Sequence, residues 1–334
     1  MKMIVDDKIP FIQEHLRLLA DEVVALNGAS IGAADVRDAD ALIVRTRTRC
    51  DESLLKGSKV QFIATATIGF DHIDTDYLER AGIAWTSCPG CNAASVAQYV
   101  ESSLLLLQQE KGLSFHDTTI GIVGCGHVGS KVRDVAERLG MRVLICDPLL
   151  GDPDFVPLSV IEHDADIITF HVPLTREGTH ATWHMADEAF FQRLRKTPYI
   201  INTSRGGVVD NTALLTAIQQ GRVRDAIIDV WEGEPHLNVE LLRRVFIGTP
   251  HIAGYSADGK TNADNMVIDA LCRHFGLPHP DKVLPPKLPA SFHYTGSPLE
   301  LYNPMRDSEA LKTNPMRFED LRNHYPLRRE YFDV

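Results

Sequence analysis

Three short segments in the second half of the chain carry side chains suited to acid–base and anion chemistry. Arg205 lies in the run N-T-S-R-G-G, Glu234 in D-V-W-E-G-E-P, and His251 in P-H-I-A-G-Y. An arginine fork binds a carboxylate, an imidazole exchanges protons near neutral pH, and a nearby carboxylate orients the imidazole and stabilises its charged form. With a hydride acceptor beside them, these groups are the ones needed to oxidise a hydroxy acid.

A dinucleotide site is predicted upstream of these segments. Gly124, Gly126 and Gly129 form G-x-G-x-x-G between an apolar run and a helix with an apolar stripe. The first glycine allows a tight turn, the second lets backbone approach a pyrophosphate, and the third lets the helix pack on the strand. Asp147 follows about 18 residues later, near the spacing of about 20 at which an acidic residue binds the ribose 2′-hydroxyl. The sequence therefore favours NAD over NADP.

The elements that must position these groups alternate between apolar runs and amphipathic segments. Such alternation predicts parallel sheets covered by helices on both faces. The first series has predicted strands at 3–5, 41–44, 62–64 and 83–85, with helices at 10–20 and 74–81, and is followed by a buried helix over 96–109. The second series has predicted strands at 119–123, 142–146, 166–172, 199–203, 226–230 and 245–247, with helices at 128–139 and 211–220, the latter capped by Asp210.

The resulting fold class is α/β, with two doubly wound parallel-sheet domains. A Rossmann NAD domain over residues 93–251 is expected to be inserted in a flavodoxin-like substrate domain formed by residues 1–92 and 252–277, because a helix over 263–275 is expected to pack back on the first domain. Five prolines between 278 and 289 predict a stiff linker, and the polar remainder to 334 is expected to form a small dimerisation segment that is helical over Phe318–Phe332 apart from Pro326.

Composition narrows the possible partners. The formal net charge of −11 over 334 residues argues against a nucleic acid or an anionic membrane. An apolar run of about 20 residues, as a membrane span needs, does not occur, and the acidic start predicts a cytoplasmic protein. Cys88 and Cys91 have the C-x-x-C spacing of redox or zinc sites, but a turn with two reduced thiols is favoured because a second ligand pair is lacking. No metal site is expected.

The chain resembles the D-isomer-specific 2-hydroxyacid dehydrogenase family, whose signatures N-x-x-R-G-x-x-V-D, D-V-x-x-x-E-P and P-H-I-A-G all occur. The resemblance implies that Arg205 binds the substrate carboxylate, His251 exchanges the proton and Glu234 is its partner. It also implies that the cofactor is NAD, bound by Gly124, Gly126, His127, Val128, Gly129, Asp147, Val172, Thr203, Asp229 and Gly254. Val172 stands where the family usually has threonine, so one hydroxyl contact to the cofactor is lost.

Within the family the chain is similar to members that oxidise a phosphorylated hydroxy acid. Thr46, Thr67 and Tyr255 match positions that contact substrate there, and we hypothesise that Arg45 helps the two threonines to hold the phosphate. The resemblance also implies a homodimer joined through the C-terminal segment, which looks shortened. Two alternatives are another D-2-hydroxy acid, such as 3-phosphoglycerate or glycerate, and an NAD-sensing binding protein on the same scaffold.

Overall fold

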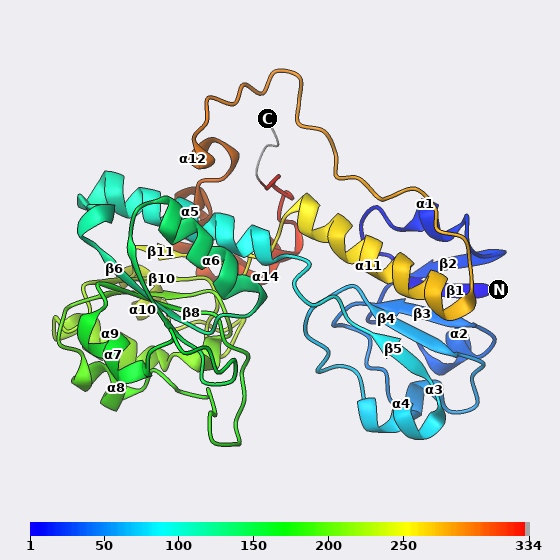
Figure 1. The fold of residues 1–334 in the computed structure, drawn as a ribbon. Helices are drawn as coiled ribbons and strands as arrows, with labels where there is room; N and C mark the ends of the chain where they lie inside the picture. Colours follow the sequence, from blue (N-terminus) through cyan, green and yellow to red (C-terminus); the bar gives the residue numbers. More distant parts are fainter. Residues whose placement is uncertain (331–334) are drawn as a thin grey trace. The chain divides into compact units, whose positions relative to one another are not determined.

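The computed structural model of the chain describes residues 1–330, which form two compact units (Figure 1). Unit 1 contains Met1–Asn92 and Ser256–Ala290, whereas unit 2 contains Ala93–Tyr255 and the C-terminal segment from Ser291. The last residues, 331–334, lie outside the described residues, and the predicted helix Phe318–Phe332 would end among them. Across residues 1–330, none of the helices has both the length and the apolar character needed to cross a bilayer.

Unit 1 is built on a five-stranded parallel sheet with the order β2-β1-β3-β4-β5, which is the flavodoxin-like order. Successive residues of β1 enter different apolar clusters, Met3 and Val5 one and Ile4 the other, so both faces of the sheet are covered. The elements are β1 (Lys2–Asp6), α1 (Gln13–Leu16), β2 (Glu22–Leu26), α2 (Ala33–Val36), β3 (Ala41–Val44), α3 (Glu52–Leu55), β4 (Phe62–Thr65), α4 (Thr75–Ala81), β5 (Ala84–Thr86) and α11 (Ala257–Phe275).

Three predictions for unit 1 need correction. Strand β2, an edge strand whose residues are all exposed or half-buried, was not predicted. The helix predicted over 10–20 shrinks to α1, since the N–H groups of Asp21 and Glu22 donate to the carbonyl of Met1 and lead the chain into that edge. Helix α11 begins at Ala257, before the predicted residue 263, because Ser256 Oγ accepts the Gly259 N–H and caps it.

Unit 2 has a six-stranded parallel sheet with the order β11-β10-β9-β8-β6-β7. All six strands predicted for this region are present, with ends that shift by about two residues at most. They are β6 (Thr119–Val123), β7 (Arg142–Cys146), β8 (Ile167–Phe170), β9 (Tyr199–Asn202), β10 (Asp225–Ile228) and β11 (Ile247–Gly248). The chain reverses direction of travel across the sheet between β6 and β8, which is where doubly wound folds bind ligands.

The helices of unit 2 cover both faces of its sheet (Figure 1). The long helix α5 is buried on most sides and packs on α6 and α12. Asp210 accepts the N–H groups of Thr212 and Ala213, as its predicted capping role requires. The helices are α5 (Ala93–Lys111), η1 (Phe115–Asp117), α6 (His127–Arg138), α7 (Leu158–Asp164), α8 (Glu188–Arg193), η2 (Gly206–Val208), α9 (Asn211–Gln219) and α10 (Val239–Arg244).

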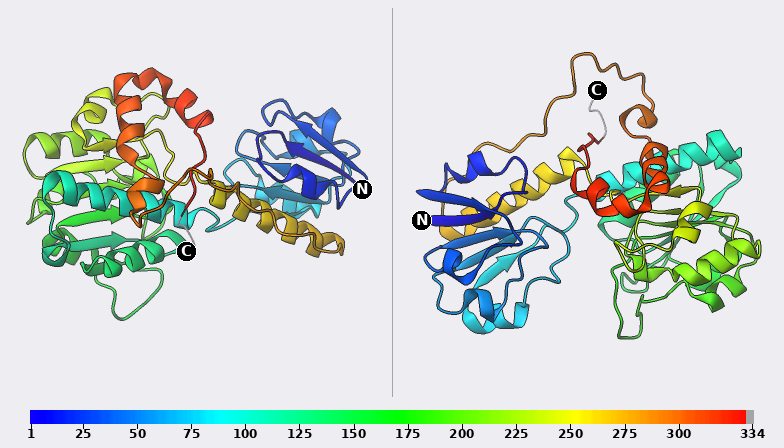
Figure 2. Two further views of the ribbon diagram at one scale, coloured as in Figure 1. Left: turned by 90° about the horizontal axis from the view of Figure 1, so that it is seen from above. Right: turned by 180° about the vertical axis from the view of Figure 1, so that it is seen from behind.

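The C-terminal segment from Ser291 is part of the core of unit 2. It forms α12 (Pro298–Leu301), α13 (Pro304–Thr313), η3 (Pro315–Arg317) and α14 (Phe318–Asn323). Tyr302, Leu311 and Phe318 join the apolar clusters of this unit, and Ser308 Oγ accepts the N–H of Gly248 in β11 at 3.0 Å. Figure 2 shows α13 and α14 lying along unit 2 in both views. The predicted helix Phe318–Phe332 stops at Asn323, ahead of Pro326.

Candidate active site

His251 and Glu234 form a hydrogen-bonded pair in unit 2. His251 Nδ1 lies 2.8 Å from Glu234 Oε2, and Glu234 Oε1 accepts the Trp231 N–H at 2.8 Å. Burial raises the pKa of Glu234, but the hydrogen bond and charge of His251, the Trp231 N–H and the Arg322 charge outweigh it, so the pKa lies below its ordinary value. Glu234 is therefore ionised at neutral pH and holds the imidazole with Nδ1 as donor, leaving Nε2 for substrate.

The loop that carries His251 is held by Asp229, a carboxylate just after β10. Its side chain accepts the hydroxyl of Thr249 at 2.7 Å and the N–H groups of Ile252 and Ala253 at 2.8 and 2.9 Å. Burial raises the pKa of Asp229 even though these bonds and the His251 charge favour the ionised form. The backbone of His251 has φ +56°, a left-handed conformation that is unfavourable for a histidine and so needs such support.

Arg205 follows β9 and lies next to the loop that carries Glu234. A Cβ on Gly206 would lie 2.0 Å from the carbonyl oxygen of Trp231, so only glycine allows the two backbones to approach this closely. Asn202 braces the turn, since its Nδ2 donates to the Arg205 carbonyl at 3.0 Å and its Oδ1 accepts the Ser204 N–H. Arg205 Nη1 donates to the Ser204 carbonyl at 2.8 Å, which leaves further donors of the guanidinium for a ligand.

The three glycines after β6 have three different surroundings. Gly124 has φ +89°, and a Cβ there would meet the His171 carbonyl and the Val172 side chain at 2.7 Å. Gly129 lies on α6, where a Cβ would meet the Gly124 carbonyl at 2.0 Å. Gly126 precedes α6 and has nothing within 4 Å of a Cβ position. The turn, the close helix packing and the open approach to a helix N-terminus are the features that a pyrophosphate site needs.

Asp147 lies against this glycine loop at the end of β7. Its Oδ2 accepts the Cys125 N–H at 2.8 Å, and its Oδ1 accepts the Leu149 N–H at 3.1 Å. The carboxylate therefore stands beside the loop at the position where a bound dinucleotide would present its adenosine ribose. His127 and Val128 begin α6, directly after the open glycine.

A second histidine, His171, follows β8 directly and contacts two threonine hydroxyls. Its Nε2 lies 2.9 Å from Thr169 Oγ1, and its Nδ1 lies 3.4 Å from Thr203 Oγ1. Burial lowers the pKa of His171 to about 3, so the ring is neutral across the physiological range. The predicted cofactor residues Val172 and Thr203 are thus neighbours of a rigid, uncharged ring at the ends of β8 and β9.

The predicted phosphate residues lie in unit 1, at the carboxyl ends of two adjacent strands. Arg45 and Thr46 follow β3, and Thr67 follows β4. Arg45 Nε lies 3.3 Å from the buried Asp6 Oδ2, so part of this arginine neutralises a structural carboxylate. Thr67 Oγ1 donates to the Gly69 carbonyl at 2.9 Å and lies 2.6 Å from Thr65 Oγ1.

The predicted residues are divided between the two units. Arg45, Thr46 and Thr67 belong to unit 1. The other predicted residues belong to unit 2: Gly124, Gly126, His127, Val128, Gly129, Asp147, Val172, Thr203, Arg205, Asp229, Glu234, His251, Gly254 and Tyr255. Sequence reasoning did not find Arg322 of α14, whose Nη1 lies 3.9 Å from Glu234 Oε2, because a lone arginine in a polar helix carries no local signal.

The C-x-x-C pair of unit 1 forms a turn that leads toward α5. The Cys91 N–H donates to the Cys88 carbonyl at 3.3 Å, and both cysteines are buried and reduced. Burial raises the pKa of Cys88, so its reactive thiolate is disfavoured. Over residues 1–330, histidine, cysteine and carboxylate side chains do not form a group of three or more that could hold a metal ion.

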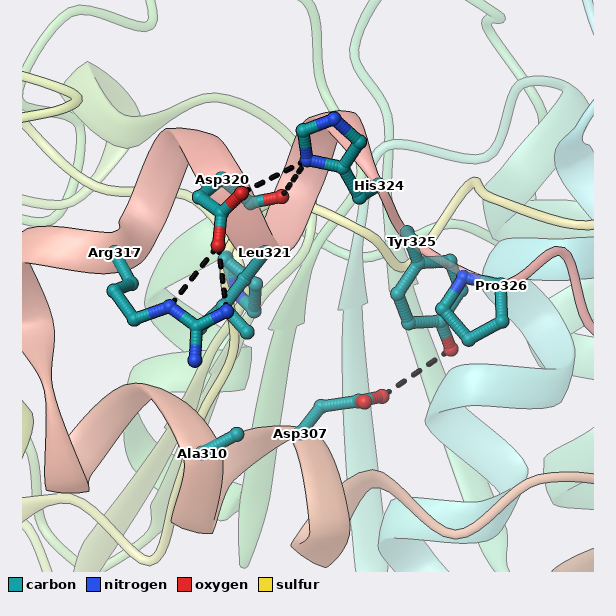
Figure 3. A pocket seen from close by; sticks show the side chains of 9 residues that line it. Asp307, Ala310, Arg317, Asp320, Leu321, His324, Tyr325 and Pro326 are labelled. Atoms are coloured by element: carbon teal, nitrogen blue, oxygen red, sulfur yellow. Dashed lines mark hydrogen bonds and ion pairs between the residues drawn. The ribbon is translucent and has the colours of Figure 1, made fainter.

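A pocket of about 200 Å³ opens at the C-terminal segment of unit 2 (Figure 3). Its charged side chains are already paired, since Arg317 and His324 both bind Asp320. The lining consists of Pro250, Asp307, Ala310, Arg317, Asp320, Leu321, His324, Tyr325 and Pro326. Pro250 directly precedes His251, so this pocket lies beside the catalytic loop rather than at the predicted cofactor or phosphate residues.

Comparisons with known proteins agree with this geometry. Residues 93–253 match the D-isomer specific 2-hydroxyacid dehydrogenase, NAD binding domain. The erythronate-4-phosphate dehydrogenase of Bacteroides fragilis is 55% identical, over 99% of this chain and 97% of its own. The Escherichia coli enzyme of the same name is 42% identical, over 99% of this chain and 92% of its own. The crystal structure of NAD⁺-bound 3-phosphoglycerate dehydrogenase from Entamoeba histolytica, 28% identical, superposes with a TM-score of 0.68 over 83% of this chain and 95% of that one.

These matches confirm the predicted fold class and the NAD-binding character of unit 2. The His251–Glu234 pair, the glycine loop and Asp147 all lie in the region that the family match covers. Because identity to named relatives reaches 55% over almost the full length, the chain belongs to the erythronate-4-phosphate dehydrogenases, a branch of the D-isomer specific 2-hydroxyacid dehydrogenase family.

Proposed function

We propose that the protein oxidises the C2 hydroxyl of 4-phospho-D-erythronate to give 2-oxo-3-hydroxy-4-phosphobutanoate, with NAD as the oxidant, in pyridoxal 5′-phosphate biosynthesis. The observation that carries the proposal is the His251–Glu234 pair, 2.8 Å apart, on a domain that matches the NAD-binding domain of this family. The named relatives, similar over nearly their full length, support the choice of substrate.

His251 is the proposed general base. Its Nδ1 is engaged by Glu234, so Nε2 is the nitrogen that takes the proton of the substrate hydroxyl. Glu234, ionised and held by the Trp231 N–H, stabilises the imidazolium that forms. In the reverse direction the imidazolium returns the proton to the ketone oxygen.

Arg205 is the proposed anchor for the substrate carboxylate, since its planar fork makes two parallel hydrogen bonds to such a group. The turn braced by Asn202 and the close backbone approach at Gly206 fix the position of the Arg205 backbone. Thr46 and Thr67, with Arg45, are the proposed donors to the phosphate, and Tyr255 is the proposed substrate contact from unit 2.

The residues after β6 and β7 fit NAD. The open space at Gly126, at the N-terminus of α6, suits the pyrophosphate, and Asp147 suits the ribose hydroxyls and repels a 2′-phosphate. Thr203, Asp229 and Gly254 are proposed for the nicotinamide side. When bound, NAD accepts the hydride from C2 of the substrate.

The direct test is the appearance of absorbance at 340 nm with NAD and a panel of 4-phosphoerythronate, 3-phosphoglycerate, glycerate and D-lactate. We expect kcat/KM for 4-phosphoerythronate to exceed that for every other acid by at least about 100-fold, because the phosphate and chain length are both recognised. A higher value for 3-phosphoglycerate or glycerate would replace the proposed substrate. Tight NADH binding without turnover of any acid would instead indicate a binding protein.

We also propose that the protein is a homodimer in the cytoplasm. The similarity of the C-terminal segment to the dimerisation part of the family supports the first statement, and the free cysteines among residues 1–330 support a reducing compartment. Light scattering after size exclusion measures the mass directly; a mass near that of a single 37.1 kDa chain at micromolar concentration contradicts the dimer.

A further inference from the structure

Arg328, near the end of the described chain, is buried in unit 2 with a side chain only 7% exposed. Its guanidinium has five N–H donors, and acceptors surround all three nitrogens. Nε donates to Gln98 Oε1 at 3.0 Å, whereas Nη1 donates to the carbonyls of Ile252 and Tyr255 at 3.0 and 2.9 Å. Nη2 donates to the Ala253 carbonyl at 2.6 Å and to the Ser95 carbonyl at 3.2 Å.

Aromatic side chains cover the charged group. The Tyr302 ring lies 3.9 Å from the guanidinium carbon, a cation–π distance, and the Tyr325 ring lies 6.0 Å away. Both hydroxyls donate to Asp307, so the nearest carboxylate is reached through the tyrosines (Figure 3 shows the Tyr325 bond). The arginine thus binds mainly neutral backbone carbonyls, and it forms no ion pair with a carboxylate among residues 1–330.

Three of these carbonyls belong to the loop that immediately follows His251. Asp229 binds the N–H groups of Ile252 and Ala253 from one side, while Arg328 binds the carbonyls of Ile252, Ala253 and Tyr255. Asp229 therefore holds the loop by its N–H groups, and Arg328 holds it by its carbonyl groups. Both side chains are buried. It starts at the left-handed backbone of His251, which makes its position dependent on such bonds.

The same C-terminal segment also contacts the partner of the histidine. Arg322 Nη1 lies 3.9 Å from Glu234 Oε2, and Arg322 Nε is buried without a hydrogen-bond partner among residues 1–330. Attaching a chain end to a core needs only apolar contacts, and a buried cation is costly unless it is fully hydrogen-bonded. One arginine of this segment therefore contacts the loop after His251 and another contacts Glu234, which indicates a role beyond attachment.

We propose that Arg328 is a positioning residue of the active site: the C-terminal segment reaches back within its own chain and uses this guanidinium to hold the 252–255 loop, and with it His251 and Tyr255, in the reactive arrangement. The role of the loop in catalysis rests on the proposed function. The clamp itself rests on the hydrogen bonds of Arg328.

The test compares Arg328→Met and Arg328→Lys with Arg317→Met in the full-length protein. Arg317 is a matched control because it belongs to the same segment but pairs with Asp320. We expect kcat to fall at least tenfold in Arg328→Met, with partial recovery in Arg328→Lys, which keeps the charge but loses the fork. Binding of ADP-ribose, a probe for the glycine loop and Asp147, is expected to change less than twofold in all three variants.

Hydrogen exchange provides a readout that does not depend on the substrate. We expect the amides of Ile252 and Ala253 to exchange at least tenfold faster in Arg328→Met than in the wild type or Arg317→Met. Unchanged exchange and unchanged kcat in both Arg328 variants would overturn the proposal. A parallel loss of ADP-ribose binding and kcat in both would overturn it too, since Arg328 would then stabilise unit 2 as a whole. Absence of turnover in the wild type would contradict the proposed function while the exchange experiment still tests the clamp.

Discussion

The catalytic end of unit 2 and the predicted phosphate end of unit 1 both lie at the carboxyl ends of parallel strands, but they are held very differently. In unit 2, Glu234 is bound by Trp231 and His251, and the following loop is bound by Asp229 and Arg328. In unit 1, Arg45 contacts Asp6, and the exposed Thr46 follows its strand directly.

This difference matches the demands on the two ends. Proton transfer needs the reacting atoms within a few tenths of an ångström of their best positions, whereas an anion is bound adequately by several donors on short loops. We therefore expect substitutions around His251 in unit 2 to lower kcat. Substitutions at the carboxyl ends of β3 and β4 in unit 1 are expected to raise KM.

The largest effect is expected from His251→Asn. The amide cannot accept the hydroxyl proton, so kcat for 4-phosphoerythronate should fall by roughly 1,000-fold, within the range of general-base catalysis. Steady-state assays at 340 nm give the value, and His163→Asn, an exposed histidine paired with Asp164, is the matched control. A loss below about tenfold would remove His251 from the role of base.

Glu234→Gln should have the next largest effect. The amide keeps the size of the side chain but loses the charge that stabilises the imidazolium, and we expect kcat to fall by roughly 10- to 100-fold. Glu232→Gln is the control in the same loop, because Glu232 binds His184 and Asn211 instead. An equal fall in kcat in both variants would show that activity depends on the structure of the loop rather than on the His251–Glu234 pair.

At the phosphate end, Thr46→Val and Arg45→Met are expected to raise KM for 4-phosphoerythronate by roughly tenfold with little change in kcat, since each removes one anion contact. Glycerate, which lacks the phosphate, should show no such increase. Arg49→Met is the control, because Arg49 pairs with Asp51 on the surface. A fall in kcat without a rise in KM would contradict the assignment of these residues to binding.

Substitution of Asp264 in α11 is expected to have the smallest effect on activity and to change the stability of the fold instead. Unlike Asp229, its buried carboxylate has no hydrogen-bond partner among residues 1–330, and burial raises its pKa to about 8. The folded state therefore keeps a proton that the unfolded chain loses near pH 4. The contribution of this carboxyl to the free energy of unfolding is fully present below pH 4. It is lost as the pH rises to about 8, by up to about 1.4 kcal/mol per pH unit.

Asp264→Asn removes this titration. We expect the variant to gain stability over the wild type as the pH rises from 5 to 8, measured as the shift in urea midpoint, with turnover at pH 7 within about twofold. The reverse trend would mean that the carboxylate is ionised and paired in the folded protein. Asp229→Asn is the contrasting variant, since there the carboxylate accepts three hydrogen bonds and its loss should be destabilising.

Several parts of the fold were predictable from local patterns. Strands such as β6 and β8 of unit 2 are runs of buried residues, and the glycine spacing with Asp147 lies within one βαβ unit, so short-range rules apply. The edge strand β2 was missed, although four of its five residues, Val23–Leu26, form an apolar run. The helix predicted to Phe332 was too long, since periodicity does not indicate where a segment leaves the helix to pack.

The candidate site was predicted in part. Residues Arg205, Glu234 and His251 were identified from their types and from family signatures, and their use in catalysis is still a prediction. The 2.8 Å contact between His251 and Glu234 needed the fold, as did the 3.3 Å contact between Arg45 and Asp6. Arg322 and Arg328 had no signal at all, because each acts on residues far away in the chain.

The sequence by itself determined the fold class, the dinucleotide loop and the types of side chain available for chemistry, since these depend on periodicity and on spacing within single supersecondary units. The tertiary structure alone decided that His251 is paired with Glu234, that the ring of His171 is neutral, and that the C-terminal segment binds the loop after His251. The physical reason is that burial and hydrogen bonding between distant segments set protonation and position, and neither is encoded in local spacing.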